Sequence, residues 1–253
     1  MPDAAPAPSV EPAAQPPSKR FRTVEVRRVD RVTPKDVRIT LGGDALDGFG
    51  TPLLGGHIKV MLPGTTEVRA YTPHHFDAAR REIEIDVILH GDSPGSRWAT
   101  AVKPGDPVDL RGPGGRGHTV DPTAAWHLLA GDACAVPAIG MVLAALPATT
   151  RAIVIVEIDD TAEERLLPSP AQVQTWWVRA GEVPGEALET AVRSIDLPEG
   201  AGQVFLACES GIMRRIRQHL IQARGLAPTS MHTRGYWKAG IVNYPDHDYG
   251  QDD

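Results

Sequence analysis

Residues 69–72 read Arg-Ala-Tyr-Thr, and they place a cation, an aromatic ring and a hydroxyl on one predicted strand that ends before Pro73. In a strand, Arg69 and Tyr71 point to one face and Thr72 to the other. This set is poorly suited to a core. It suits a flat ligand that carries phosphate, since a guanidinium neutralises phosphate and a ring packs on a flat surface. A surface arginine beside a half-buried tyrosine is the alternative interpretation.

A second polar group follows the next predicted strand, in HGDSPGSRWA (90–99). A short helix is expected over 93–102, because Ser followed by Pro is typical of a helix start. Backbone N–H groups near Gly95 and Ser96 can then bind an anion. This helix start is the second half of a predicted diphosphate site, of which Arg69 is the first half. An ordinary turn with a helix cap is the alternative interpretation.

Two loops in the second half of the chain follow apolar runs. Gly131 and Asp132 come at the end of WHLLAG, and residues 208–211 come at the end of QVFLAC. In an open α/β sheet, a nicotinamide cofactor binds at the carboxyl ends of the strands. A GxGxxG fingerprint is absent, so plain strand-to-helix connections are the alternative interpretation of both loops.

The elements that must position these residues differ between the two halves of the chain. Residues 21–121 contain six short segments that alternate polar and apolar residues, separated by Gly, Pro and Asp. Strands this close together favour an antiparallel β-barrel over βαβ units. The six segments are FRTVEVRRV, DVRITL, HIKVML, EVRAYT, EIEIDVIL and DPVDL.

After Pro122, near-continuous apolar runs, as expected for strands buried on both faces, alternate with helical patterns, which predicts a five-stranded, doubly wound parallel sheet. The predicted strands are WHLLAG (126–131), AIVIVEI (152–158), VQTWWV (173–178), QVFLAC (203–208) and MHTRGYW (231–237). The predicted helices span 134–146, 160–167, 185–195 and 210–224. The last helix is expected to bury Ile212, Ile216, Leu220 and Ala223, with Ser210 as its N-cap.

Composition excludes several classes of protein. Of 253 residues, 42% are hydrophobic, which suffices for packed cores, and the net charge of −6 argues against a general nucleic-acid binder. The longest apolar runs are too short to span a bilayer. Two cysteines, Cys134 and Cys208, cannot supply the four thiolates of an iron–sulfur cluster. Residues 1–20 are rich in Ala and Pro without the apolar core of a signal peptide, so we expect a disordered tail and a cytoplasmic protein.

Five segments, in this order and spacing, resemble the siderophore-interacting proteins, flavin-dependent ferric-siderophore reductases related to the ferredoxin–NADP reductase superfamily. The segments are RAYTPHHFD, DVILHGDSPGSRWATAVKPGD, LRGPGGR, LLAGDACAVPAI and RGYWKAG. The resemblance covers about residues 20–241. It implies an FAD-binding barrel at 21–122, an NAD(P)H-binding α/β domain at 123–241 and a C-terminal tail at 242–253. The family often has other residues at His74, Ala133–Cys134, Cys208–Glu209 and Arg116.

The residues above and the resemblance together define three sets of site residues. For FAD they are Arg69, Ala70, Tyr71, Thr72, His74, His90, Gly95, Ser96, Trp98 and Trp237. For NADPH or NADH they are Asp132, Glu209, Ser210 and Arg179. For the ferric siderophore they are Lys59 and Lys238, which the resemblance supports, and Arg116, which we infer from a shifted position. Neither a catalytic side chain nor a protein-bound metal is expected.

Some assignments keep alternatives. Trp237 and Tyr236 either cover the flavin or complete the core of the last strand. Arg179 and Arg214 could contact an NADPH 2′-phosphate, yet Glu157 closes a nearby strand with the opposite charge. The tail YPDHDYGQDD offers little apolar area and is expected to be a surface appendage.

The predicted function is transfer of electrons from NAD(P)H through FAD to a ferric siderophore, with release of Fe(II). Reduction weakens the hold of hard oxygen ligands on iron, and a flavin links a two-electron donor to a one-electron acceptor. One alternative is a flavoreductase that supplies a separate protein acceptor. The other is a non-catalytic ferric-siderophore-binding protein. The expected partner is a ferric siderophore. We expect the protein to be a monomer that neither binds nucleic acid nor inserts into a membrane.

Overall fold

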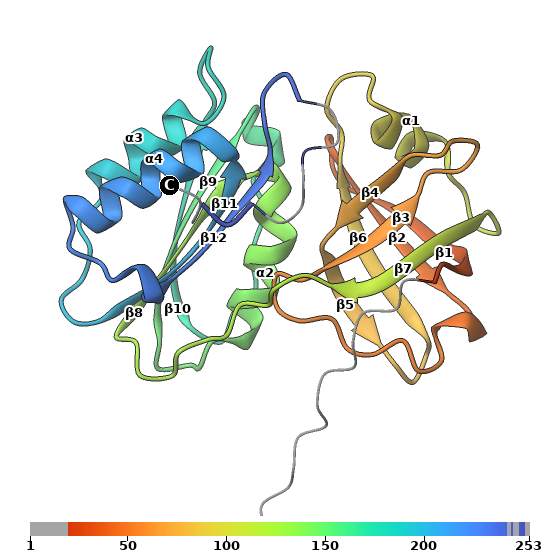
Figure 1. Ribbon diagram of the computed structural model, residues 1–253, viewed down its shortest axis with the longest axis horizontal. Coiled ribbons are helices and arrows are strands. Elements are labelled where there is room, and N and C mark those ends of the chain that lie inside the picture. The colour runs from red at the N-terminus through yellow and green to blue at the C-terminus, as the bar shows by residue number, and fades with distance from the viewer. Residues whose placement is uncertain (1–19, 242–243, 245–247, 251–253) are drawn as a thin grey trace, which may run out of the picture.

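The computed structural model describes residues 20–241, 244 and 248–250. Residues 1–19 of the predicted N-terminal tail, and 242–243, 245–247 and 251–253 of the predicted C-terminal tail, lie outside the described residues. Figure 1 shows two bodies side by side, an N-terminal antiparallel sheet and a C-terminal parallel sheet with helices on both faces.

The first body is a seven-stranded antiparallel sheet in the order β4-β3-β7-β1-β2-β6-β5. Its two edge strands follow one another in the chain and are joined by Thr72 alone, so the sheet curls back on itself as the predicted barrel. The strands are β1 (Arg22–Thr33), β2 (Asp36–Gly42), β3 (His57–Met61), β4 (Val68–Tyr71), β5 (Pro73–Asp77), β6 (Glu82–Ile88) and β7 (Pro107–Gly114).

Strand β5 is absent from the six predicted strands, of which one ends before Pro73 and the next begins at Glu82. Proline does end β4, but it is also tolerated as the first residue of an edge strand, and here it begins one. Alternation places Ile83 and Ile85 in the barrel core. Helix α1 (Pro94–Ala101), close to the predicted helix, adds Trp98 to that core.

The second body is the predicted doubly wound sheet, with five parallel strands in the order β10-β9-β8-β11-β12. The strands are β8 (Trp126–Asp132), β9 (Arg151–Ile158), β10 (Gln172–Arg179), β11 (Gly202–Glu209) and β12 (Met231–Trp237). The helices are α2 (Val136–Ala145), α3 (Glu186–Ser194) and α4 (Ser210–Gln222). Helices α3 and α4 cover one face of the sheet, and α2 covers the face turned toward the barrel (Figure 1).

Three expectations for this body are wrong in detail. Residues 160–167 form only a single 3-10 turn at Thr161–Glu163, because this segment packs on the barrel. Helix α4 is capped by the Glu209 side chain rather than by Ser210. Its buried stripe contains Met213 and does not contain Ala223, which is exposed. Strand β10 lies at the sheet edge, so its residues are mostly exposed.

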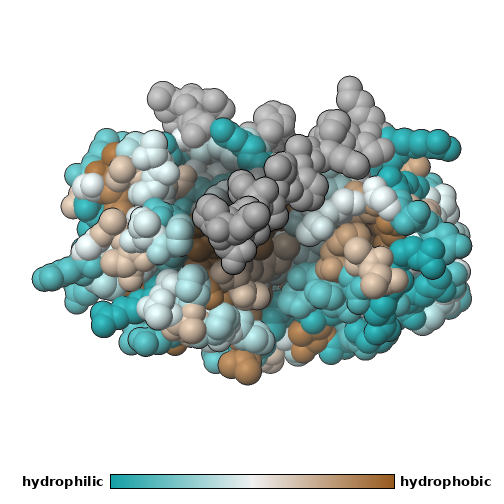
Figure 2. Space-filling view, turned by 90° about the horizontal axis from the view of Figure 1, so that it is seen from below, coloured by the Kyte–Doolittle hydropathy of each residue, from teal (hydrophilic) through white to brown (hydrophobic). Residues whose placement is uncertain are grey.

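One part of the interface between the two bodies is apolar. Leu54 and Val120, from the barrel side, pack against the core formed by α2 and the parallel sheet. Figure 2 shows hydrophobic residues gathered in the middle of one face of the molecule, with hydrophilic surface on both sides. Within the described ranges, no helix is long and apolar enough to cross a lipid bilayer.

Candidate functional site

The end of β4 carries the Arg-Ala-Tyr-Thr motif at the corner where the barrel closes. The antiparallel register pairs Arg69 with Val60 and Tyr71 with Ile58, so both side chains share the face of buried β3 residues, as predicted. The Tyr71 ring packs against the barrel core. Burial raises the pKa of Tyr71 although Arg69 opposes the rise, so the phenol stays a neutral hydrogen-bond donor.

The N-terminus of α1 lies against this motif. The Ser93 hydroxyl accepts the Ser96 N–H at 3.2 Å, and the Ser96 hydroxyl accepts the His90 N–H at 3.0 Å. A Cβ atom on Gly95 would lie 3.0 Å from the Tyr71 hydroxyl, so the helix start approaches Tyr71 closely. The structure therefore brings the two predicted halves of the diphosphate site together, with the His90 side chain exposed beside them.

A flavin fits these residues. Arg69 supplies a cation, and its guanidinium already contacts the Glu67 carboxylate. The Trp98 ring lies 6.1 Å from the Tyr71 ring, and its indole Nε1 is buried without a hydrogen-bond partner among the described residues. Because buried polar groups in folded proteins are nearly always paired, this donor points to an unfilled contact. A cation, two aromatic rings and a glycine at a helix start form a cradle for a dinucleotide.

Two contacts join this corner to the second body. Helix α2 packs against β5, and the turn Ala133–Ala135 after β8 packs against β6. Tyr236 on β12 packs on the core beside α2, and its hydroxyl is buried without a hydrogen-bond partner among the described residues. The carboxyl edge of the parallel sheet thus meets the closing corner of the barrel.

The predicted nicotinamide residues lie along this carboxyl edge. Asp132 ends β8, and its carboxylate accepts the Trp237 Nε1–H at 2.7 Å and the Cys134 N–H at 3.0 Å. Burial raises the pKa of Asp132 to about 6, although these two hydrogen bonds oppose the rise. Glu209 accepts the Ile212 N–H at 2.9 Å and so caps α4. Asp132 and Trp237, predicted for different cofactors, are therefore direct partners.

Ser210 is fully buried beneath the C-terminal tail. Its hydroxyl donates to the Asp248 carboxylate at 2.7 Å, and Arg214 donates two further hydrogen bonds to Asp248 at 2.8 and 2.9 Å. The Tyr244 hydroxyl reaches the same carboxylate at 2.6 Å. The expectation of a tail that is only a surface appendage is wrong, because the Asp248 carboxylate is buried and accepts hydrogen bonds from Ser210 and Arg214.

This leaves Arg179 as the candidate for a 2′-phosphate, since Arg214 is engaged by Asp248. Arg179 ends β10 and is exposed. Glu157 does not oppose it, because the Glu157 carboxylate is buried and accepts the N–H groups of Gly185 and Leu188 at 2.5 and 2.9 Å. Its charge is used to cap α3.

The three basic residues predicted for the siderophore lie on separate segments. Lys59 is on β3, opposite Ala70 and Arg111. Arg116 lies over the Tyr249 ring of the tail at 4.9 Å, and Lys238 is exposed just after β12. A joint cluster of the three stays a prediction. His74, on β5, is partly buried beside the ion pairs of the barrel, and burial and the nearby Arg38 lower its pKa.

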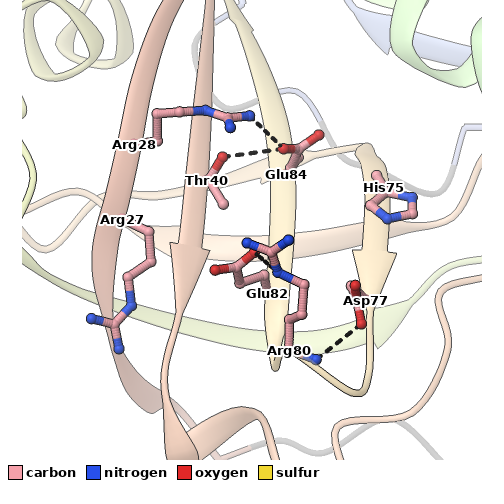
Figure 3. Close-up of a pocket in the computed structure, with 8 residues that line it drawn as sticks. All are labelled: Arg27, Arg28, Thr40, His75, Asp77, Arg80, Glu82 and Glu84. Carbon is pink, nitrogen blue, oxygen red and sulfur yellow. Dashed lines mark hydrogen bonds and ion pairs between the residues drawn. The ribbon is translucent and has the colours of Figure 1, made fainter.

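A separate pocket on the barrel lies away from these residues. Figure 3 shows a pocket of about 310 Å³ on the outer face of β1, β2, β5 and β6. Its charges face one another: Arg28 reaches Glu84 at 3.1 Å and Arg80 reaches Glu82 at 3.1 Å. Among the residues that the structure describes, no three His, Cys, Asp or Glu side chains gather as a metal site.

Sequence reasoning missed two contacts of the site. The packing of β5 against α2 had no signal in either segment alone, because each pattern indicates burial and not the partner that buries it. The contact of Asp248 with Ser210 had none either, since Asp248 lies in a polar tail without periodicity.

The chain matches known families over both bodies. Residues 25–68 and 65–117 match the family described as "Siderophore-interacting FAD-binding domain", and residues 124–240 match "Siderophore-interacting protein". It is 31% identical over 244 residues to "Ferric vibriobactin reductase ViuB" of Vibrio cholerae, covering 87% of this chain and 90% of the relative.

Other relatives agree. The chain is 26% identical to the "NADPH-dependent ferric-chelate reductase" of Escherichia coli, covering 87% of this chain and 94% of the relative. It superposes on the crystal structure of a siderophore utilization protein from T. fusca with a TM-score of 0.82 and 30% identity, over 92% of this chain and 98% of the other. The chain belongs to the siderophore-interacting protein family.

Proposed function

We propose that this protein reduces ferric siderophores with electrons from NAD(P)H, using FAD held by residues 21–122 and a nicotinamide held by residues 123–241. The observation that carries the proposal is the packing of β5 and β6, at the barrel corner that holds Thr72, against α2 and the turn Ala133–Ala135 at the carboxyl edge of the parallel sheet. Ferric-reductase relatives in V. cholerae and E. coli support the same class of reaction.

The barrel residues bind and orient the flavin in this proposal. Arg69 and the N–H groups of α1 hold the diphosphate, Tyr71 packs on the flavin, and Thr72 hydrogen-bonds near its reactive edge. When bound, FAD would supply the link between a two-electron donor, the nicotinamide, and a one-electron acceptor, ferric iron. Asp132 holds the Trp237 indole, and the two side chains together line the approach to the flavin.

The substrate arrives as a ferric chelate, which is often anionic. Lys59 and Lys238 attract it, with Arg116 as a third cation, although the whole chain carries a net charge of −6. We place the reaction in the cytoplasm and the protein there as a monomer.

The flavin assignment is tested by Arg69→Ala. The dissociation constant for FAD should rise roughly tenfold, because one charge-assisted contact to the diphosphate is lost. Arg97→Ala is the matched control, since Arg97 is exposed on α1 and pairs with Asp92 at 3.1 Å. Equal FAD affinity in wild type and Arg69→Ala contradicts the assignment.

The reaction is tested by anaerobic mixing of the FAD-loaded protein with NADH or NADPH, followed by a ferric chelate. Bleaching of the flavin by nicotinamide and its recovery on addition of chelate are the expected results. Bleaching without recovery favours a flavoreductase with a protein acceptor. No bleaching, together with chelate binding, favours the non-catalytic carrier.

Two sets of variants test the substrate and nicotinamide residues. Lys59→Ala/Lys238→Ala should raise KM for an anionic ferric chelate at low salt, and the effect should shrink as salt screens the charges. Lys103→Ala, an exposed lysine near Asp106, is the control. Arg179→Ala should raise KM for NADPH more than for NADH, with Arg151→Ala, at the other end of the sheet, as its control.

A further inference from the structure

Residues 159–165 leave the parallel sheet after β9 and pack on the turn between β1 and β2 of the barrel. The Thr33 hydroxyl donates to the Glu163 carboxylate, which also accepts the Lys35 N–H at 3.0 Å. The Lys35 ammonium reaches Asp159 at 2.7 Å. Glu163 is buried, so this carboxylate is shielded from water by the barrel.

Arg165 reaches further into the barrel. Its guanidinium donates to the Asp36 carboxylate on β2 and lies 3.7 Å from the Asp86 carboxylate on β6. Arg38 donates two hydrogen bonds to the same Asp86 at 2.7 and 2.9 Å. The Asp36 and Asp86 side chains are 0% and 1% exposed. Two barrel carboxylates therefore share two arginines, one of which comes from the other body.

The barrel depends on Arg165 for its charge balance. Burial and the neighbouring Asp86 raise the pKa of Asp36, and Arg165 opposes that rise. One Asp36 oxygen, Oδ1, has no hydrogen-bond partner among the described residues. Two carboxylates that are buried this close together repel one another unless cations lie between them. Removing Arg165 would leave Arg38 to balance both.

The ion cluster formed by Asp36, Arg38, Asp86 and Arg165 lies directly behind the flavin corner. Asp86 follows Ile85 on β6, and Ile85 pairs with Pro73, the residue after Thr72. His74, the next residue, lies close enough to Arg38 and Arg165 for both to lower its pKa, after the larger effect of burial. A shift of this cluster therefore reaches β5, which packs against α2 of the other body.

We infer that Arg165 is a positioning residue that fixes the barrel corner at Thr72 against the carboxyl edge of the parallel sheet at Asp132. The inference rests on the proposed function, because it assigns to Arg165 the alignment of the flavin with the nicotinamide. Glu163 and Asp159 hold the same segment and support the alignment.

The test separates the two half-reactions of the FAD-loaded protein. In Arg165→Met, which keeps the length of the side chain and removes its charge, reduction of the flavin by NAD(P)H should slow roughly tenfold or more, because small misplacements of reacting groups are costly. Oxidation of the dithionite-reduced protein by a ferric chelate should keep the wild-type rate. Arg165→Lys should restore part of the first rate, and Arg165→Met/Asp36→Asn should restore more, since it removes the unbalanced carboxylate.

Arg215→Met is the matched control, because Arg215 pairs with Glu189 at 2.7 Å within the α/β body. Both half-reactions should keep wild-type rates in this control. Unchanged nicotinamide-driven reduction in Arg165→Met overturns the inference. So does equal slowing of both half-reactions, which indicates general damage rather than misalignment.

A second readout does not need a working reductase. In the flavin-free protein, the Lys35 amide should exchange with solvent faster in Arg165→Met than in wild type, because its acceptor Glu163 lies on the released segment. Equal Lys35 exchange in both proteins contradicts the inference. If the wild-type flavin is not reduced by either nicotinamide, the proposed function fails, and amide exchange alone decides whether Arg165 holds the two bodies together.

Discussion

The outer face of β2 and β6 is one row of polar pairs whose two ends have different surroundings. At one end, Arg38 faces Asp86, and Arg165 of the α/β body covers both. At the other, Thr40 faces Glu84 beside the open pocket of Figure 3. The Asp86 side chain is 1% exposed, whereas Glu84 is 18% exposed and its partner Arg28 is 60% exposed. Two carboxylates on one sheet face thus differ in whether the other body covers them, and they also differ in their arginine partners.

This difference in exposure decides how much each charge contributes to the free energy of unfolding. An exposed ion pair contributes little, because water solvates both partners whether or not they meet. A buried carboxylate that loses its cation is strongly destabilising. The same alternation of residues along EIEIDVI therefore yields a surface contact at one end and an interdomain contact at the other.

The largest expected effect comes from removing the barrel arginine at the covered end of this row. Arg38→Met leaves Asp86 with only the more distant Arg165, and the free energy of unfolding should fall by about 3 kcal/mol. Denaturant titration followed by fluorescence measures the change. Arg28→Met, at the open end, is the control and should stay within about 0.5 kcal/mol of wild type. Similar losses in both variants would contradict the comparison.

The fold was largely predictable because local patterns agree with it. Period-two alternation in the first half and long apolar runs in the second reflect the burial of each strand, and both sheet types were predicted correctly. Residues 160–167 were wrong for a physical reason. Their polar residues resemble a helix, but Glu163 and Arg165 have their partners more than 120 residues earlier in the chain.

The site was predictable in parts. Arg69 and Tyr71, with the helix start at Gly95, could be proposed because each motif lies on a single element and its residue types limit its chemistry. Their use by a flavin stays a prediction. Contacts between elements could not be foreseen: the packing of β5 on α2, or the hydrogen bond of Ser210 to Asp248, depends on how two bodies and a tail pack. The same holds for the cluster around Arg165.

Buried carboxylates whose pKa is raised and those whose pKa is lowered affect stability at opposite ends of the pH range. Measuring stability against pH therefore distinguishes them. Burial raises the pKa of Asp36 to about 6. Its contribution to stability is therefore present below its unfolded pKa of about 4 and is lost as the pH rises through 6. Relative to Asp36→Asn, wild type should lose about 2 kcal/mol between pH 4 and pH 7.5. Thermal unfolding across this range measures the difference, and a constant difference between the two proteins would be the contrary result.

Asp248 is a covered carboxylate with the opposite sign. Hydrogen bonds from Tyr244, Ser210 and Arg214 outweigh burial, and the pKa of Asp248 is lowered to about 2. Its contribution is present above pH 4 and is lost as the pH falls toward 2. Asp248→Asn should cost about 1.5 kcal/mol at pH 7, the range for a hydrogen bond to a charged group. Equal stability of this variant and wild type at pH 7 would return the tail to the role of a surface appendage.

The smallest effect is expected at the open end of the row. Glu84 accepts hydrogen bonds from Arg28 at 3.1 Å and from Thr40 at 3.2 Å, but water reaches the pair through the pocket. Glu84→Gln keeps the shape and removes the charge, so the free energy of unfolding should change by less than about 0.5 kcal/mol. A double-mutant cycle with Arg28→Met should give a coupling of about 0.3 kcal/mol that disappears in high salt. A coupling as large as the loss in Arg38→Met would mean that covering by Arg165 does not cause the difference between the two ends. The contribution of each carboxylate to the free energy of unfolding would then come from the barrel alone.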